Sequence, residues 1–349
     1  MQAAVFYGPL NLRIEERPTP RVGKGDVLVK VEACAICGTD IRIFHFGHRA
    51  ITGPQILGHE IAGVIAEKGE GVEGYEVGDR VVVDPIVSCG QCFFCQRGLT
   101  NLCLVFKEKT EAFGYYYPGG FAEYVLVPEK AVRRGNLIKF PENLSFEEAA
   151  ISEPMACALN GELLSRVGLG DRVLVIGAGP VGCMHIALAR VLGATKVLVA
   201  EIQKARLEEA KRFGADRIIN PTEENLKEAV LAETQGIGPD VVIVAASSRK
   251  AQEEAIELAA PRGRVNFFGG LPKDDRLVTV DGNTVHYKEL FIHGTSGATA
   301  SHIRTCLELM STGRIDGRAY ISKVIPLEEL PKMLEEIQKG PYLKVVVKP

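Results

Sequence analysis

Four cysteines lie close together in the segment CGQCFFCQRGLTNLC: Cys89, Cys92, Cys95 and Cys103. Thiolates at this spacing can wrap one tetrahedral zinc ion, and a closed set of four leaves no open position for chemistry. We therefore expect a structural zinc site. A redox CxxC pair would need a strand before it and a helix after it, and neither is apparent. A nucleic-acid-binding zinc ribbon is disfavoured, because Arg97 is the only basic residue between the first and last cysteine.

A second set of metal-ligating residue types is spread more widely along the chain. Cys37 lies in CGTD, His59 and Glu60 lie in GHE, and Glu153 lies in SEP. One thiolate, one imidazole and carboxylates are ligands that zinc accepts at an open, catalytic site. Taken singly, these residues are equally well explained as a core cysteine, a satisfied histidine and surface glutamates, since this spacing fixes no geometry.

A glycine-rich segment, GAGPVG, follows the apolar run VLVI and precedes a helical pattern. In that context it can present helix N–H groups to the pyrophosphate of a dinucleotide. The candidate cofactor-binding residues in it are Gly177, Gly179, Pro180, Val181 and Gly182.

The next expected strand, KVLVAE, ends at Glu201. A carboxylate there can accept hydrogen bonds from the ribose hydroxyls of NAD and disfavours the 2′-phosphate of NADP. We therefore expect NAD as the cofactor, with NADP less favoured. Arg206 can either cover the adenine or meet a 2′-phosphate, and Glu201 can also be a solvated strand end.

The elements that must position these residues follow two patterns. Residues 1–150 contain short β-rich runs such as VLVKVEA and IAGVIAE, separated by turns, which is typical of an all-β module. From Asp171 onward, apolar strands alternate with helical stretches, which predicts a parallel sheet covered by helices. A chain of 349 residues exceeds the size at which single cores stop growing, so two domains are expected. The stretches after LFIHGTSG can belong to either domain.

The composition of the chain argues against two classes of binding partner, nucleic acids and membranes. The formal net charge is −3 and charged residues make up 24% of the chain, so nothing points to nucleic acid or an anionic membrane. The N-terminal residues do not resemble a secretory signal, which favours a cytoplasmic protein. The run from Val173 to Ala189 lacks charges but is short and interrupted by glycine and proline, so we expect no membrane helix.

Four other cysteines are expected to be small buried hydrophobes: Cys34, Cys157, Cys183 and Cys306.

The chain resembles the zinc-containing medium-chain dehydrogenases nearly from end to end. The resemblance rests on five motifs and on their order along the chain: CGTD, GHE, the four cysteines, Glu153-Pro154 and GAGPVG. Glutamate stands at position 153, where classical alcohol dehydrogenases carry a cysteine ligand. The chain is therefore most similar to the polyol (sorbitol or L-iditol) and threonine dehydrogenase branch.

The resemblance implies an α/β fold with two domains. A GroES-like, β-rich catalytic domain would span residues 1–154, include the zinc lobe at 89–103 and be completed by residues 296–349. A Rossmann domain with a doubly wound parallel sheet would span 155–295. The resemblance also implies two zinc ions per chain, one structural and one catalytic, the latter held by Cys37, His59 and one or both of Glu60 and Glu153. Relatives form dimers or tetramers, so a homo-oligomer is expected.

The implied activity is hydride transfer between NAD and a secondary alcohol or ketone of a polyol or sugar derivative, with zinc acidifying the substrate hydroxyl. Thr39 is the candidate first proton acceptor, and Asp40 can accept the second ring N–H of His59. Both can equally be ordinary turn residues. One alternative is amino-alcohol oxidation of the threonine 3-dehydrogenase kind. Another is a non-catalytic, cofactor-binding member of the fold, which predicts loss of the Cys37 or His59 position.

The chain departs from its relatives at two places. Many family members have a proton-relaying histidine five residues after the cysteine ligand, whereas this chain has Arg42. His45 is a candidate substitute; Arg42 can instead meet a carboxylate or phosphate on the substrate, or be a solvated surface residue. Sorbitol-specific relatives have an Arg-Tyr pair after the last Rossmann strand, where this chain reads GTSGATASH from Gly294 to His302. These small hydroxyl residues can bond a polyol or line the nicotinamide amide.

Overall fold

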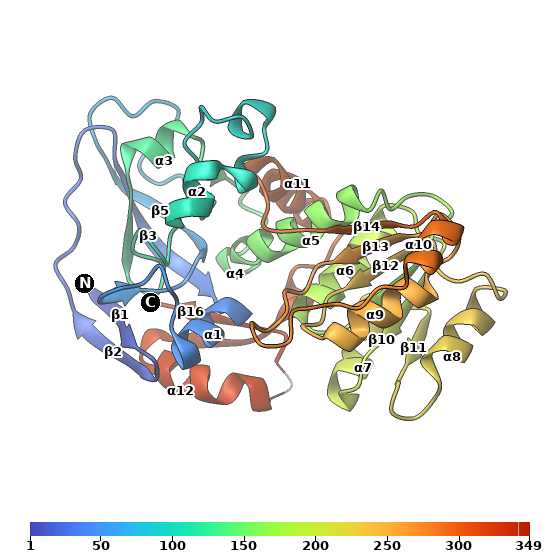
Figure 1. Cartoon of the computed structure of the whole chain (residues 1–349). Coiled ribbons are helices and arrows are strands. Elements are labelled where there is room, and N and C mark those ends of the chain that lie inside the picture. The colour runs from blue at the N-terminus through green and yellow to red at the C-terminus, as the bar shows by residue number, and fades with distance from the viewer. Residues whose placement is uncertain (341) are drawn as a thin grey trace. The chain divides into compact units, whose positions relative to one another are not determined.

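The computed structural model describes residues 1–340 and 342–349 and divides the chain into two units. Unit 1 comprises Met1–Ala156 together with Ala298–Pro349, and unit 2 comprises Cys157–Gly297. Each unit has its own hydrophobic core. Figure 1 follows the chain through both, and the red C-terminal elements belong to unit 1 with the blue N-terminal ones.

Unit 1 is built on β-sheets. Its strands are β1 (Gln2–Gly8), β2 (Asn11–Glu16), β3 (Val27–Ala35), β4 (Gln55–Ile56), β5 (Glu60–Lys68), β6 (Arg80–Val83), β7 (Tyr124–Val127), β8 (Leu137–Lys139), β15 (Ile321–Pro326) and β16 (Lys344–Lys348). The larger sheet has the order β15-β16-β3-β5-β6-β8, with β7 also paired to β3, and the smaller one has the order β2-β1-β4. Residues 1–150 therefore form sheets as expected, but they are not all-β, because they also contain the helices described next.

Short helices and turns connect these strands. They are α1 (Gly38–Phe46), η1 (Cys95–Arg97), η2 (Thr100–Leu102), α2 (Leu104–Lys109), α3 (Glu129–Arg133), α4 (Phe146–Ala150), α11 (Ala300–Ser311), η3 (Arg318–Tyr320), η4 (Leu327–Glu329), α12 (Leu330–Glu336) and η5 (Ile337–Lys339). A longer helix, α5 (Ser152–Leu164), contains the point at which the chain passes from unit 1 to unit 2.

Strand β3 lies at the centre of the large sheet because its sequence, VLVKVEACA, is rich in β-branched and small residues that pack on a pleated surface. It pairs with β5 in antiparallel register, with Ala35 opposite Glu60, and with β16, where Val346 lies opposite Ala35. The end of β3, the start of β5 and the start of β16 therefore meet at one edge of the sheet.

Unit 2 is a parallel sheet of six strands in the order β11-β10-β9-β12-β13-β14. These strands are β9 (Arg172–Ile176), β10 (Lys196–Ala200), β11 (Arg217–Ile219), β12 (Val241–Val244), β13 (Arg264–Phe267) and β14 (Phe291–Gly294). The accompanying helices are α6 (Pro180–Val191), α7 (Lys204–Arg212), α8 (Leu226–Glu233), α9 (Arg249–Leu258) and α10 (Gly282–Lys288).

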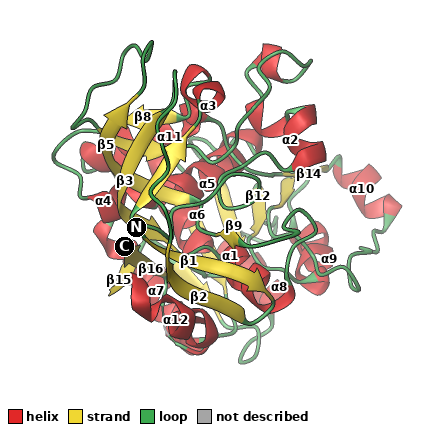
Figure 2. Ribbon diagram, turned by 90° about the vertical axis from the view of Figure 1, so that its left-hand side faces the viewer, coloured by secondary structure: helices red, strands yellow, loops and turns green. Residues whose placement is uncertain are grey.

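The inner strands are continuous apolar runs because helices cover the sheet: α6 packs on β9 and β10, and α9 packs on β12 and β13. Figure 2 shows helices α6 and α9 in red with strands β9 and β12 of this sheet in yellow. The strand order is that of a doubly wound dinucleotide-binding sheet, whose ligand site lies at the carboxyl ends of the strands where the order reverses. Here that point lies between β9 and β12. None of the helices formed by residues 1–340 and 342–349 is long and apolar enough to span a membrane.

Candidate active site and metal centres

The four cysteines of the 89–103 segment converge, with sulfur atoms that all lie within 4.8 Å of one another. The Sγ atoms of Cys92 and Cys95 are 3.5 Å apart, and those of Cys89 and Cys95 are 3.9 Å apart. The backbone N–H of Cys89 lies 3.2 Å from Cys103 Sγ. Four convergent sulfur atoms are a donor set that fits a tetrahedral zinc ion.

Unit 1 contains a second convergent group, formed by Cys37, His59 and Glu60, whose ligand atoms also lie within 4.8 Å of one another. Cys37 is the N-cap of helix α1, just after β3 ends. Glu60 opens β5 and pairs with Ala35. The antiparallel register therefore brings the CGTD and GHE segments together. A thiolate, an imidazole and a carboxylate leave room for a further ligand, so these residues fit a catalytic zinc ion.

Asp40 links the two segments. Its Oδ2 accepts the Cys37 N–H at 2.9 Å, and its Oδ1 accepts the Gly58 N–H at 3.3 Å. The same Oδ1 lies 3.4 Å from His59 Nδ1, where Asp40 can orient the ring. Burial opposes a charge on His59, but Asp40 and Cys37 raise the pKa of His59 well above its usual value. Since zinc takes neutral imidazole, metal binding would have to displace a proton here.

A buried ion pair holds Glu60. The Nζ atom of Lys344 lies 2.7 Å from Glu60 Oε1 and 2.5 Å from Oε2, and it also donates to the Ile36 carbonyl at 2.8 Å. Burial, partly offset by Lys344 and reinforced by the charge of Glu153, raises the pKa of Glu60 to about 7. Sequence reasoning missed Lys344, because it is a single charged residue at the start of an apolar strand and lies far along the chain from Glu60.

Other predicted residues of unit 1 lie outside the convergent group. Glu153, in the first turn of α5, is not among the clustered ligand atoms, although its charge acts on Glu60. Thr39 is half-buried in the first turn of α1, close in sequence to Cys37. Arg42 is exposed on the same helix, and the ring of His45 packs against those of Phe44 and Phe46.

The glycine-rich turn of unit 2 has the backbone expected of a phosphate-binding turn. Gly177 has φ +100°, and a Cβ on Gly182 would lie 1.9 Å from the Gly177 carbonyl oxygen, so neither position accepts a side chain without strain. Gly179 is the N-cap of α6, with Pro180 in its first turn and Val181 next. A Cβ on Gly179 would meet only the Arg206 guanidinium, at 3.7 Å. The turn is therefore open where a pyrophosphate would approach.

Glu201 is 6% exposed and uses both carboxylate oxygens. Oε2 accepts the Ala178 N–H at 2.8 Å, while Oε1 accepts the N–H groups of Ile202 at 2.8 Å and Gln203 at 2.9 Å. The carboxylate thus ties the glycine turn after β9 to the end of β10.

The polar stretch after β14 crosses from one unit to the other. In unit 2, Thr295 and Asn266 exchange hydrogen bonds, with the Asn266 Nδ2 donating at 3.0 Å, and the Gly297 carbonyl accepts from Asn160 at 2.8 Å. In unit 1, Thr299 is the N-cap of α11. The hydroxyl of Thr295 and the cap at Thr299 therefore have local structural partners.

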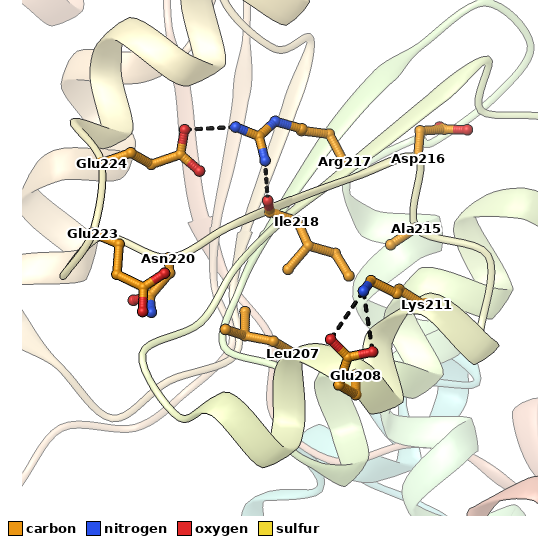
Figure 3. A pocket seen from close by; sticks show the side chains of 10 residues that line it. All are labelled: Leu207, Glu208, Lys211, Ala215, Asp216, Arg217, Ile218, Asn220, Glu223 and Glu224. Carbon is orange, nitrogen blue, oxygen red and sulfur yellow. Dashed lines mark hydrogen bonds and ion pairs between the residues drawn. The ribbon is translucent and has the colours of Figure 1, made fainter.

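A cavity of about 520 Å³ lies beside β11 in unit 2 (Figure 3). Its two cations already contact carboxylates: Arg217 lies 2.5 Å from Glu224, and Lys211 lies 2.9 Å from Glu208. Because its charges are neutralised locally, we assign no role to this cavity.

Comparison with known proteins agrees with these features. Residues 23–139 match the family model of the alcohol dehydrogenase GroES-like domain, and residues 180–312 match that of zinc-binding dehydrogenases. L-threonine 3-dehydrogenase of Pyrococcus horikoshii is 40% identical over 85% of this chain and 82% of its own. D-xylulose reductase A of Aspergillus oryzae is 31% identical over 98% of this chain and 95% of its own.

Among solved structures, a Sinorhizobium meliloti protein described as a zinc-binding dehydrogenase and bound to NADP superposes with a TM-score of 0.91. It is 34% identical and the match covers 100% of this chain and 99% of that protein. The expected fold class, a GroES-like domain with a parallel-sheet cofactor-binding domain, is confirmed. The chain belongs to the zinc-containing medium-chain dehydrogenase family, in its polyol and threonine dehydrogenase branch.

Proposed function

We propose that this protein transfers hydride between NAD(H) and a secondary alcohol or ketone of a polyol or sugar derivative. The group formed by Cys37, His59 and Glu60 carries the proposal, because three different zinc-ligand types converge there at the edge of one sheet. In this proposal unit 1 is the catalytic domain and unit 2 the cofactor-binding domain.

Each residue at or near the Cys37, His59 and Glu60 group has a separate role in this proposal. Cys37, His59 and Glu60 would hold catalytic zinc, with Glu153 available as an exchanging ligand. Bound zinc would supply a Lewis acid toward the substrate oxygen, and bound nicotinamide would supply the hydride acceptor. Asp40 would orient His59, Lys344 would hold Glu60 in a fixed position, and Thr39 would accept the first proton.

The preference for NAD rests on Glu201. A buried carboxylate beside the glycine turn would accept ribose hydroxyls and repel a 2′-phosphate. The guanidinium of Arg206 near Gly179 would meet the cofactor phosphates. Because the related Sinorhizobium protein is bound to NADP, any activity assay should compare NAD with NADP.

Amino-alcohol oxidation is the second candidate, favoured by the extensive identity to threonine 3-dehydrogenase. Formation of the reduced cofactor should therefore be followed with both NAD and NADP on polyols, sugar acids, sugar phosphates, threonine and simple alcohols. Turnover of threonine alone would replace the polyol assignment.

The metal assignment is tested by Cys37→Ser. We expect the wild type to contain two zinc ions per chain and the variant to keep one and to lose at least 100-fold in kcat/KM, since a missing ligand disturbs the Lewis acid, which is worth several kcal/mol. Cys306→Ala, which changes a buried cysteine of α11 outside both groups, is the matched control and should keep both ions and turnover. Unchanged zinc content in Cys37→Ser would contradict the ligand assignment.

A further inference from the structure

A row of rings extends from the Cys37, His59 and Glu60 group along unit 1. The ring of Tyr115 lies 6.0 Å from that of His59, and it also meets the ring of His48 edge-on at 5.2 Å. Tyr115 follows the 89–103 lobe in sequence, whereas His48 follows helix α1. Tyr115 is thus the side chain that joins the metal-ligating group to the residues at the end of α1.

The Tyr115 hydroxyl has no hydrogen-bond partner among the described residues, and burial raises the pKa of Tyr115 to about 12. It is therefore a neutral O–H group, able to donate one hydrogen bond and to accept others. A polar hydroxyl in a largely buried ring beside a candidate catalytic histidine is placed to contact whatever binds there.

The tautomer of His48 follows from its backbone contact. Its Nδ1 accepts the Ala50 N–H at 3.2 Å, so the neutral ring carries its proton on Nε2 and presents a donor on that side. Burial, together with the charges of Arg42 and Arg49, lowers the pKa of His48 and keeps the ring neutral.

Arg42 and Arg49 lack counter-charges. Neither makes a hydrogen bond or ion pair with any residue in 1–340 or 342–349, and no carboxylate contributes to the potential at His48. Some other arginines of the chain are paired with acids, such as Arg172 with Asp240 and Arg264 with Asp171. The charges of Arg42 and Arg49 act on His48, and His48 meets the ring of Tyr115. Two guanidinium groups and two neutral donors, Tyr115 and His48, therefore share this region of unit 1.

We propose that Arg42, His48, Arg49 and Tyr115 bind an anionic oxygen group of the substrate, so that the natural substrate is a sugar acid or sugar phosphate and not a neutral polyol or simple alcohol. This rests on the proposed function, because it places the reacting hydroxyl at the Cys37, His59 and Glu60 group. The anion would then lie farther along the sugar chain, beyond the Tyr115 ring. Guanidinium groups match carboxylate and phosphate oxygens, and the exposure of Arg42 and Arg49 lets the anion enter from solvent.

The test uses three ligands that share one carbon skeleton: sorbitol, gluconate and sorbitol 6-phosphate. With the zinc-loaded full-length enzyme and NAD, we expect kcat/KM for one of the anions to exceed that for sorbitol at least tenfold. Gluconate as the better substrate would identify a carboxylate, and sorbitol 6-phosphate would identify a phosphate. Equal or better use of sorbitol would overturn the inference and leave the proposed dehydrogenase function intact.

Variants test whether the preference for the anionic substrate depends on the proposed residues. We expect Arg42→Gln and His48→Gln each to lower kcat/KM for the preferred anion at least tenfold more than for sorbitol, mainly through KM, and Arg42→Lys to restore part of the loss. Arg21→Gln, which removes an exposed arginine elsewhere in unit 1, is the control and should leave the ratio unchanged. Equal losses on charged and neutral substrates would show that the α1 residues act only structurally.

If no compound is oxidised, the proposed function fails and binding still decides the inference. Isothermal titration of the zinc- and NADH-bound protein with gluconate, sorbitol 6-phosphate and sorbitol would then be compared between wild type and Arg42→Gln. Tighter binding of an anion that the variant loses supports an anion site, and no preference for either anion excludes it.

Discussion

At the scale of single residues, Asp84 is a buried carboxylate that the proposed chemistry does not use. It is 5% exposed, its Oδ1 accepts the Ile86 N–H at 3.1 Å, and burial together with the charge of Glu153 raises its pKa from its usual range to about 7. Because the folded state keeps the proton to higher pH than the unfolded chain, stability is lost as pH rises from about 4 to about 7.

Asp84→Asn removes this titration but keeps an oxygen to accept the Ile86 N–H. We expect the variant to gain stability relative to wild type as pH rises from 5 to 8, by on the order of 2–4 kcal/mol at the upper end. Urea unfolding at several pH values measures it. A difference between the two proteins that is the same at every pH would show that Asp84 is ionised throughout.

At the scale of elements, the turn that begins α6 needs glycine for two different reasons: one position must avoid a clash with the backbone, and another must leave room for the cofactor. A Cβ on Gly182 would overlap the Gly177 carbonyl oxygen, whereas one on Gly179, whose φ is −67°, would make only an ordinary contact with the Arg206 guanidinium at 3.7 Å. We expect Gly182→Ala to destabilise the protein by about 1–3 kcal/mol, since backbone must move.

Gly179→Ala should leave the unfolding free energy within about 0.5 kcal/mol of wild type and weaken NADH binding at least tenfold, because the methyl group occupies the approach of the pyrophosphate. Thermal unfolding and NADH fluorescence titration of the two variants check the pair. Wild-type NADH affinity in folded Gly179→Ala would place the cofactor phosphates elsewhere.

At the scale of the whole molecule, the cysteine lobe and the cofactor turn belong to units with separate cores. Within the 89–103 lobe only Asn101 and Cys103 are buried, so few other contacts hold it. We expect Cys92→Ser to lose one zinc ion, to lower the melting temperature of unit 1 by about 10 °C and to open the 89–110 segment to proteolysis. NADH should still bind, because unit 2 keeps its core. Loss of NADH binding together with the lobe would show that the two units unfold as one.

Much of the fold and of the candidate site was readable in the sequence because the determining contacts are local. The turn GAGPVG acts through backbone conformation over six residues, and the four cysteines lie within one loop. The alternation of strands and helices from Asp171 onward predicts a parallel sheet through hydrophobic periodicity alone. Asp40 is three residues from Cys37, so its hydrogen bond to the Cys37 N–H is likewise local.

Only the tertiary structure decided which distant residues share a site. The β3 and β5 register brings Cys37 to His59 and Glu60, and the return of β16 to β3 places Lys344 against Glu60, 284 residues away along the chain. Tyr115 and His48 also meet only in the folded structure, and neither has a local pattern that marks it. Sequence spacing determines which residue types are available for chemistry, but strand register and side-chain burial determine which of them meet and what charge they carry.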